Sequence, residues 1–369
     1  MHSDPRPRLT PAIADTRRAV REALTRSFDG ELASGRQPGP ESRGRVSAEP
    51  KFSVERDGAG GGGLVLVALS GGADSLALAA ATAFEAPRSG LRAGAVIVDH
   101  GLQAGSADAA AAAAETARAL GLAPVLITRV SVQDDGSGPE AAARSARYQA
   151  FEQAMRETGA GRVLLGHTLD DQAETVLLGL ARGSGPASLQ GMAAETGPYL
   201  RPLLGIRRAL TRQFCADAGL SPWADPQNHD PRYARVRVRD RVLPVLEQEL
   251  GPGIAGALAR TAEQLREDAD ALDAMVLEVI EEICEPAEGG IAVSVAALAA
   301  NPPALRHRVI RFVVESEFGV TLSRTQTLAA ARLVTHWHGQ KGVDLPGVRV
   351  ERQNGLLVFR VTRAAAADQ

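Results

Sequence analysis

The stretch LVLVALSGGADS, residues 64–75, decides the fold class of this 369-residue chain. Its first six residues form a short apolar run, which predicts a buried strand. A helical stretch begins directly afterwards, near residue 73. Gly71 and Gly72 let an anion approach their backbone N–H groups, and the helix N-terminus adds partial positive charge. We therefore predict a phosphate-binding turn formed by Ser70, Gly71, Gly72, Ala73, Asp74 and Ser75.

The same alternation of strand and helix continues to about residue 182. Apolar runs at 93–100, 123–130 and 161–168 predict further strands, and 199–206 a last one. Helical patterns cover 73–86, 106–120, 139–158 and the residues after 168. This alternation predicts a doubly wound parallel sheet with helices on both faces. Because ligands bind at the carboxyl ends of such strands, we expect the functional residues there. We assign residues 63–225 to this catalytic α/β domain.

The flanking segments differ in character. Residues 9–28 have helical spacing, whereas 29–62 are rich in Gly, Pro and Ser and predict a flexible segment. Residues 1–62 are therefore set apart from the catalytic domain. Residues 226–369 predict a smaller, mainly helical C-terminal module. It would contain a long helix or helical pair over 240–284, helices at 303–317 and 323–337, and a hairpin formed by VRVER and LLVFRV.

Composition excludes several classes of protein. The chain is 44% hydrophobic and 23% charged with a net charge of −3. It has no apolar run near the ~20 residues of a membrane span, and its first residues lack a secretory pattern. We expect a cytoplasmic protein without membrane contact. Cys215 and Cys284 cannot form a disulfide framework, zinc site or iron–sulfur site unaided. Residues 201–241 hold nine arginines against four aspartates, which suits either a solvated face or a surface for phosphate.

Asp74 is the unusual residue of the turn, because a carboxylate does not belong in a simple anion site. It would make sense as a ligand of Mg²⁺ that also binds phosphate, or as a residue that favours the helix start. The sequence leaves both open. The Walker A and GxGxxG patterns are absent.

The string SGGxDS resembles the pyrophosphate loop of the ATP pyrophosphatase superfamily, whose fold is of the adenine nucleotide alpha hydrolase type. This resemblance implies cleavage of ATP to AMP and pyrophosphate, with Mg²⁺, through an adenylated substrate. Further sequence motifs indicate which family of this superfamily the chain resembles. They are VDHGL (98–102), EAAARSARY (140–148), GHTLDDQAET (166–175), RGSG (182–185), RPLL (201–204) and WADPQN (223–228). Their order is similar to the tRNA(Ile)-lysidine synthase family from about residue 64 to 246.

That resemblance implies a C–N bond-forming ligase acting on an isoleucine tRNA with a CAU anticodon. ATP would adenylate the C2 oxygen of C34, the first anticodon base, and the ε-amine of free L-lysine would displace AMP. The product lysidine pairs with A, which changes the codon read from AUG to AUA. Asp171 and Glu174 share a helix face and would hold lysine, with one carboxylate helping to remove an ammonium proton. The alternative is that the acids only favour the helix N-terminus.

The remaining site residues follow from their positions. His167 ends a strand, so we expect it to contact nucleotide or cytidine and group it with Asp74, Asp171 and Glu174 as catalytic. Asp99, His100 and Arg144 are expected to bind ATP, and Arg147 to bind phosphate of ATP or tRNA. The predicted RNA-contacting residues are Arg201, Arg207, Arg208, Trp223, Arg235, Arg237 and Arg239. Val236 departs from the family pattern, which has Asn there, so a polar contact is lost.

Three rivals remain on sequence grounds. A tRNA thiolase shares the SGGxDS loop but needs catalytic cysteines. A small-molecule synthetase would not need the basic segment at 201–241, and an RNA-binding protein without activity would not need the loop. The oligomeric state stays open, with a homodimer among the options.

Overall fold

A computed structural model describes residues 9–33, 63–101, 105–130, 139–183, 185–225 and 230–362. The described chain divides into two compact units, one formed by residues up to 265 and one by residues from 266. Each is treated by itself. The predicted flexible segment at 29–62 lies outside the described residues, except that 29–33 end the first helix.

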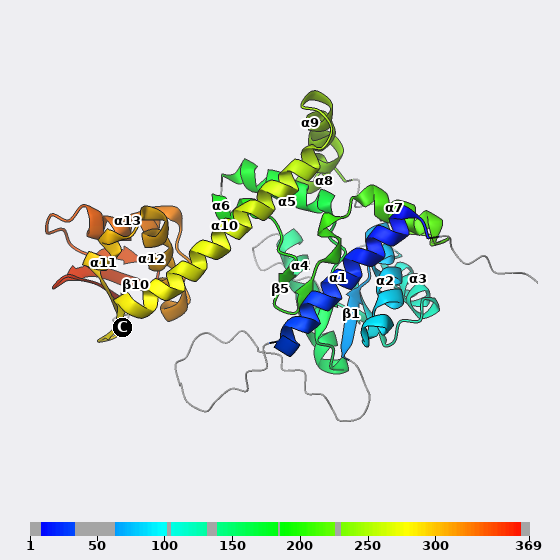
Figure 1. Ribbon diagram of the computed structural model, residues 1–369, viewed down its shortest axis with the longest axis horizontal. Helices are drawn as coiled ribbons and strands as arrows, with labels where there is room; N and C mark the ends of the chain where they lie inside the picture. The colour runs from blue at the N-terminus through cyan, green and yellow to red at the C-terminus, as the bar shows by residue number, and fades with distance from the viewer. Residues whose placement is uncertain are drawn as a thin grey trace, which may run out of the picture. The chain divides into compact units, whose positions relative to one another are not determined.

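The first unit contains a six-stranded sheet (Figure 1). Five strands run parallel, and the short β5 (Glu195–Thr196) pairs antiparallel with β6 (Tyr199–Leu200). The other strands are β1 (Leu64–Ala68), β2 (Arg92–Asp99), β3 (Val125–Arg129) and β4 (Arg162–Leu164). Their order, β3-β2-β1-β4-β6-β5, reverses direction between β1 and β4. Such a switch point opens a crevice at the carboxyl ends of the strands, where ligands bind.

Helices cover both faces of this sheet. The side chains of β1 alternate: Val65 and Val67 pack into one core cluster, Leu64 and Leu66 into another. The first cluster packs against α2 (Ala73–Glu85) and α3 (Ser106–Ala119), and the second against α4 (Pro139–Thr158). Helices on both faces of the sheet confirm the prediction of a doubly wound parallel sheet. Because β1 is buried on both faces, its side chains are apolar throughout and do not alternate with polar ones.

The N-terminal helix α1 (Pro11–Ala33) belongs to the first unit, although we expected residues 1–62 to stand apart. Ile13, Val20 and Leu24 are at most 1% exposed and join the core cluster of α2. Figure 1 shows α1 in blue beside α2 and α7 (Arg208–Asp217), which it contacts. The helix buries its apolar face against them, which the sequence pattern alone could not indicate.

The boundary expected near residue 225 also differs in the structure. Helix α8 (Ala234–Arg237), the π-helical turn η4 (Val238–Val242) and α9 (Leu243–Glu249) pack on α5 (Leu169–Arg182). Leu243 shares a small core cluster with Ala173 of α5. The remaining elements of this unit are η1 (Pro87–Ser89), α6 (Pro186–Leu189) and η2 (Pro202–Gly205). The long helix α10 (Ile254–Ile283) begins in the first unit and ends in the second.

As predicted, helices form more of the second unit than strands do, and a five-stranded antiparallel sheet accompanies them. The strands lie in the order β7-β8-β11-β10-β9, and the predicted hairpin of β10 and β11 turns through Asn354 and Gly355, both at positive φ. Its elements are β7 (Cys284–Ala287), β8 (Gly290–Ser294), α11 (Val295–Ala300), α12 (Pro303–Phe318), α13 (Arg324–Thr335), β9 (Val343–Leu345), β10 (Val348–Gln353) and β11 (Leu356–Val361). Among the described helices of both units, none is long and apolar enough to cross a membrane.

Candidate functional site

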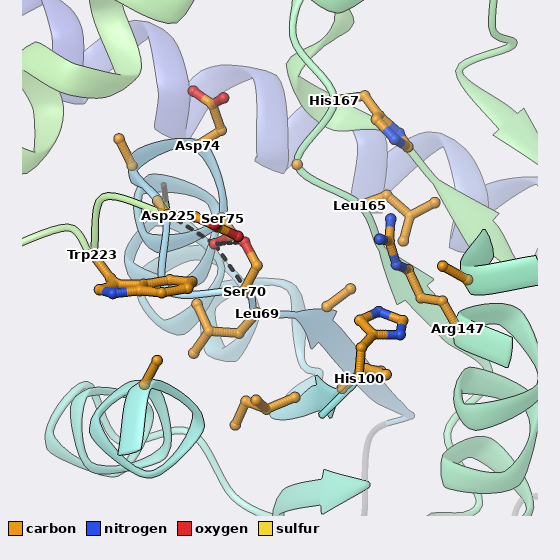
Figure 2. A pocket seen from close by; sticks show the side chains of 18 of the residues that line it. Leu69, Ser70, Asp74, Ser75, His100, Arg147, Leu165, His167, Trp223 and Asp225 are labelled. Atoms are coloured by element: carbon orange, nitrogen blue, oxygen red, sulfur yellow. Dashed lines mark hydrogen bonds between the residues drawn. The ribbon is translucent and has the colours of Figure 1, made fainter. Parts of the chain in front are cut away.

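A cavity of about 870 Å³ opens at the carboxyl ends of the parallel strands in the first unit. Figure 2 shows Ser70 and Ser75 between Trp223 on one side and His100, Arg147 and His167 on the other. Most of the predicted site residues line it: Ser70, Gly72, Ala73, Asp74, Ser75, Asp99, His100, Arg144, Arg147, His167, Asp171, Arg208, Trp223, Arg235 and Arg239.

The predicted turn at residues 70–75 is held in shape by its own hydroxyl groups. The Ser75 hydroxyl accepts from the Ser70 N–H at 3.2 Å and donates to the Gly72 carbonyl at 3.0 Å. Gly71 has φ +83°, a conformation that favours glycine. Its carbonyl accepts from the Trp223 N–H at 2.9 Å, which fixes the segment around Trp223 against the turn. The N-terminus of α2 is thereby left free to face an anion.

The backbone of the loop after β4 lies directly against the backbone of this turn. A Cβ atom on Gly166 would lie 3.2 Å from the backbone nitrogen of Ser75. A side chain there would push the two loops apart, because the contact is with backbone that cannot rotate away. Glycine at 166 therefore keeps the two loops beside the switch point in register.

Asp74 lines the cavity, and among the described residues no side-chain hydrogen bond caps the N-terminus of α2. The Asp74 carboxylate accepts from the hydroxyl of Thr211 on α7, and the Nε atom of Arg208 lies 3.5 Å away. Burial raises the pKa of Asp74, with a further contribution from Asp171, while the Thr211 hydrogen bond and Arg208 act in the opposite direction. Thr211 was not expected from the sequence, although it lies one helical turn after Arg208.

Glu174 lies beneath the cavity wall and does not line it. Its side chain is 0% exposed, and it accepts from Arg208 Nη1 at 3.1 Å, Arg235 Nε at 2.7 Å and Arg239 Nε at 2.8 Å. The cations that Glu174 holds in this structure are thus arginines of the chain itself. Arg208, Arg235 and Arg239 also line the cavity, and their expected contact with RNA stays a prediction.

Asp171 caps the N-terminus of α5 and also pairs with two arginines. One oxygen caps α5, accepting from the Thr168 N–H at 2.8 Å, and the other accepts from Arg208 at 2.9 Å and Arg235 at 3.2 Å. Burial opposes ionisation, but the two arginines and the Thr168 hydrogen bonds outweigh it and lower the pKa of Asp171 to about 2. The carboxylate is therefore charged at neutral pH and lines the cavity.

The opposite wall carries polar groups that lack partners. Nδ1 of His100 and Nδ1 of His167 are buried without a hydrogen bond among the described residues. Burial lowers the pKa of His167 to about 4, and burial together with Arg147 lowers the pKa of His100. Burial and Arg144 likewise lower the pKa of Arg147. Buried polar atoms without partners are costly unless a ligand satisfies them, so this wall is suited to a polar ligand.

Other predicted residues are placed differently. Asp99 lines the cavity but is only 6% exposed and accepts from the Gly101 N–H at 2.9 Å. Arg144 lies against the ring of Tyr148, 4.9 Å from its centroid. Val236 is buried, so it packs rather than facing RNA. Arg212, which we did not predict, also lines the cavity; its position one turn after Arg208 on the same helix face was an available signal.

Three predicted RNA-contacting arginines do not line the cavity. Arg201 is only 6% exposed and donates to the Ala193 carbonyl at 2.9 Å, a structural contact, while its expected contact with RNA stays a prediction. Arg207 pairs with Asp170 at 3.1 Å. Arg237 donates to backbone carbonyls of its own segment, at 2.7 and 2.8 Å.

The cysteines take no part in the cavity. Cys215 is buried in the core and Cys284 begins β7 in the second unit, and neither lines the cavity. Within the described ranges, no group of three or more His, Cys, Asp or Glu residues could hold a metal ion. A metal at Asp74 would therefore take its other ligands from phosphate or water.

Comparisons with known proteins agree with this geometry. A family model described as a PP-loop domain matches residues 55–246, and one described as a TilS substrate binding domain matches 294–357. The tRNA(Ile)-lysidine synthase of Leifsonia xyli is 68% identical over 299 residues, covering 81% of this chain and 90% of the relative. The chain belongs to the tRNA(Ile)-lysidine synthase family. The tRNA(Ile)-lysidine synthase of Salinispora tropica is 48% identical over 357 residues, covering 95% of this chain and 96% of the relative.

A solved structure shares the fold at low sequence identity. It is a U34-tRNA thiolase from Methanococcus maripaludis with a [4Fe-4S] cluster, with a TM-score of 0.52 and 20% identity, covering 69% of this chain and 80% of that one. At this identity the likeness concerns architecture alone. Membership of the tRNA(Ile)-lysidine synthase family rests on the sequence relatives and on the loop and acids of the cavity.

Proposed function

We propose that this chain converts C34 of isoleucine tRNA with a CAU anticodon to lysidine, using ATP and free L-lysine. One combined observation carries the proposal. The SGGADS turn and the Asp171 carboxylate line a single cavity, in a chain 68% identical over 299 residues to a tRNA(Ile)-lysidine synthase. The turn suits the phosphates of ATP, and the carboxylate suits an amine substrate.

The first step activates the base. The C2 oxygen of C34 attacks the α-phosphorus of ATP, the bond to pyrophosphate breaks, and an adenylated cytidine results. The backbone N–H groups at the start of α2 and the Ser70 hydroxyl would bind the departing pyrophosphate. Mg²⁺ fits this site when shared with phosphate oxygens, since the Asp74 carboxylate is a hard oxygen donor facing the cavity. When bound, it would reduce the negative charge of the phosphates.

The second step consumes lysine. The ε-nitrogen forms a bond to C2, the C2–O bond breaks, and AMP leaves. Asp171, which stays ionised at neutral pH because its pKa is about 2, suits an ammonium group of lysine. Glu174 would act from beneath, by fixing Arg208, Arg235 and Arg239.

Proton transfer limits the roles of the remaining groups. An ammonium has no lone pair, so it must lose a proton before it attacks C2. His167 is a weak base because its pKa is about 4, and it stays neutral at physiological pH. We therefore assign His167 to hydrogen bonding with the cytidine or nucleotide, rather than to proton removal.

The partners follow from this chemistry. The substrates are the isoleucine tRNA, L-lysine and ATP, and a cytoplasmic location would give access to all three. The second unit would contribute tRNA contacts, in keeping with the description of the family match at 294–357. Thiolation is disfavoured because neither cysteine lines the cavity.

The test is incubation of the full chain with ATP, labelled lysine and the isoleucine tRNA transcript, with a methionine tRNA bearing the same anticodon as control. Label should enter the isoleucine tRNA alone, and AMP release should depend on lysine. The Asp171→Asn variant should need a higher lysine concentration while its KM for ATP changes little. Lysine-independent AMP release, or label absent from the tRNA while a sulfur donor modifies C34, would refute the proposal.

A further inference from the structure

The second unit carries a cluster of basic side chains that the catalytic cavity does not use. The α12–α13 basic cluster consists of Arg306, His307, Arg308 and Arg311 on α12 and Arg324 at the first residue of α13. The segment 303–335 holds five arginines and one histidine against two glutamates. The cluster therefore has an excess of positive charge in a chain whose net charge is −3.

Two members of the cluster are already engaged. Arg308 pairs with Asp273 of α10 at 2.5 Å. Arg306 donates to the carbonyls of Leu298 at 2.8 Å and Asn301 at 2.8 Å, near the end of α11. These contacts give both arginines a structural role. Neither Arg306 nor Arg308 is therefore counted toward a ligand site.

Arg311 and Arg324 have no such partner. Among residues 230–362, neither guanidinium has a hydrogen bond or an ion pair within 4 Å, although Arg311 is half-buried. Elsewhere in this unit arginines do find carboxylates: Arg349 pairs with Asp344 at 2.7 Å, and Arg360 with Glu351 at 3.7 Å. Arg311 and Arg324 thus differ from these paired arginines in having no carboxylate within 4 Å among the described residues.

The unpaired cations lie close enough to repel one another. His307 and Arg311 are one turn apart on α12, and α12 packs against α13, which begins with Arg324. Burial and then Arg306, Arg311 and Arg324 lower the pKa of His307. Burial and then Arg308 lower that of Arg311, with Asp273 and Glu315 opposing and Arg324 adding to the repulsion. Repulsion of this kind lowers stability unless an anion offsets it.

The first turn of α13 adds to the same positive field. Ser323 caps this helix of 12 residues by accepting from the Gln326 N–H at 3.3 Å, and Arg324 follows the cap directly. The partial positive charge of a helix N-terminus therefore lies beside the Arg324 backbone. Guanidinium groups present a planar fork of donors that matches the oxygens of a phosphate.

We propose that Arg311 and Arg324, with His307 beside them, bind a backbone phosphate of the substrate tRNA. The inference rests on the proposed function, which supplies a tRNA as partner. An RNA phosphate is the anion we commit to because the family match at 294–357, described as substrate binding, spans the whole cluster. Contacts of this kind contribute affinity and orientation without reading sequence.

The test compares two double variants of the full chain by fluorescence anisotropy with labelled isoleucine tRNA across a range of salt concentrations. Arg311→Gln with Arg324→Gln should raise Kd roughly tenfold and reduce the slope of log Kd against log salt by about 0.7–0.9, the contribution of one phosphate contact. Arg349→Gln with Arg360→Gln makes the same charge change at paired arginines. It should change Kd by less than about twofold if the site is specific.

Three outcomes would overturn the inference. The first is an unchanged Kd and slope in the Arg311/Arg324 double variant, and the second is an equal loss in the control, which would mean that net charge alone matters. The third is a marked fall in the melting temperature of the Arg311/Arg324 double variant, because removing repulsion should leave the melting temperature unchanged or raise it. Failure of the proposed function is separate: it would appear as no lysine incorporation by the unmodified chain, whatever its tRNA affinity.

Discussion

The buried imidazole of His167 should make the stability of this protein depend on pH. Burial lowers its pKa from 6.5 to about 4 in the folded chain, with Asp171 opposing and Arg201 adding to the shift. As pH falls below 6.5, the unfolded chain binds a proton that the folded chain does not accept until about pH 4. Stability is therefore full above the unfolded pKa and is lost as pH falls through this window.

The size of the effect follows from the shift. A shift of one pKa unit corresponds to about 1.4 kcal/mol, so the full loss is roughly 3 kcal/mol below pH 4, and about 2 kcal/mol of it has occurred by about pH 5. Denaturant unfolding at about pH 7.5 and about pH 5 measures it. His167→Asn should lose about 2 kcal/mol less between these two pH values than the unmodified chain, whereas His336→Asn, at an exposed site, should behave like the unmodified chain.

An equal pH dependence in the unmodified chain and in His167→Asn would refute this reasoning. It would mean that the imidazole is hydrated or already paired in solution, so that its burial carries no electrostatic cost. The hydrogen-bonding role proposed for His167 would then lose its support, because that role requires a neutral imidazole shielded from water in the cavity wall.

Three further substitutions test other parts of the site. Glu174→Gln should lower the free energy of unfolding by about 3–5 kcal/mol in urea titrations, because three guanidinium groups lose their shared carboxylate; equal stability to an exposed Glu267→Gln control would count against the ion cluster. Thr211→Val should reduce kcat for lysine-dependent AMP release by about tenfold through the lost hydrogen bond to Asp74, and Thr211→Ser should restore it. Cys215→Ala with Cys284→Ala should keep activity within about twofold, since neither cysteine lines the cavity; complete loss would favour thiol chemistry.

Much of the first unit could be predicted because its strands are short apolar runs separated by helices. The pattern failed where local signals were weak. The expected strand at 199–206 is reduced to Tyr199–Leu200, because Pro202 begins a 3₁₀ turn. In the second unit the helices at 303–317 and 323–337 and the hairpin were predicted, whereas β7, β8 and β9 were not. The pairing of β8 with β11 joins Val293 to Leu357, positions too far apart in sequence for any local pattern to indicate.

The site was predicted in its acids and its loop, but not in their partners. A parallel sheet with known strand ends places residues 70–75 and His167 at one edge, so these could be located from sequence. The ion pairs of Glu174 join it to Arg208 and Arg239, which lie 34 and 65 residues further along the chain. No periodicity or motif spacing encodes contacts of that range.

The basic segment at 201–241 shows why counting charges along a sequence overestimates a surface for RNA. Of its nine arginines, seven have partners within the described chain: Arg201, Arg207, Arg208, Arg232, Arg235, Arg237 and Arg239. Three of the seven pair with Asp171 or Glu174 of α5, which lie outside the segment that was counted. A positive charge attracts a phosphate only where no carboxylate already neutralises it. On that criterion Arg212 in the cavity, and Arg311 and Arg324 in the second unit, are stronger candidates for RNA contact than the seven paired arginines of residues 201–241.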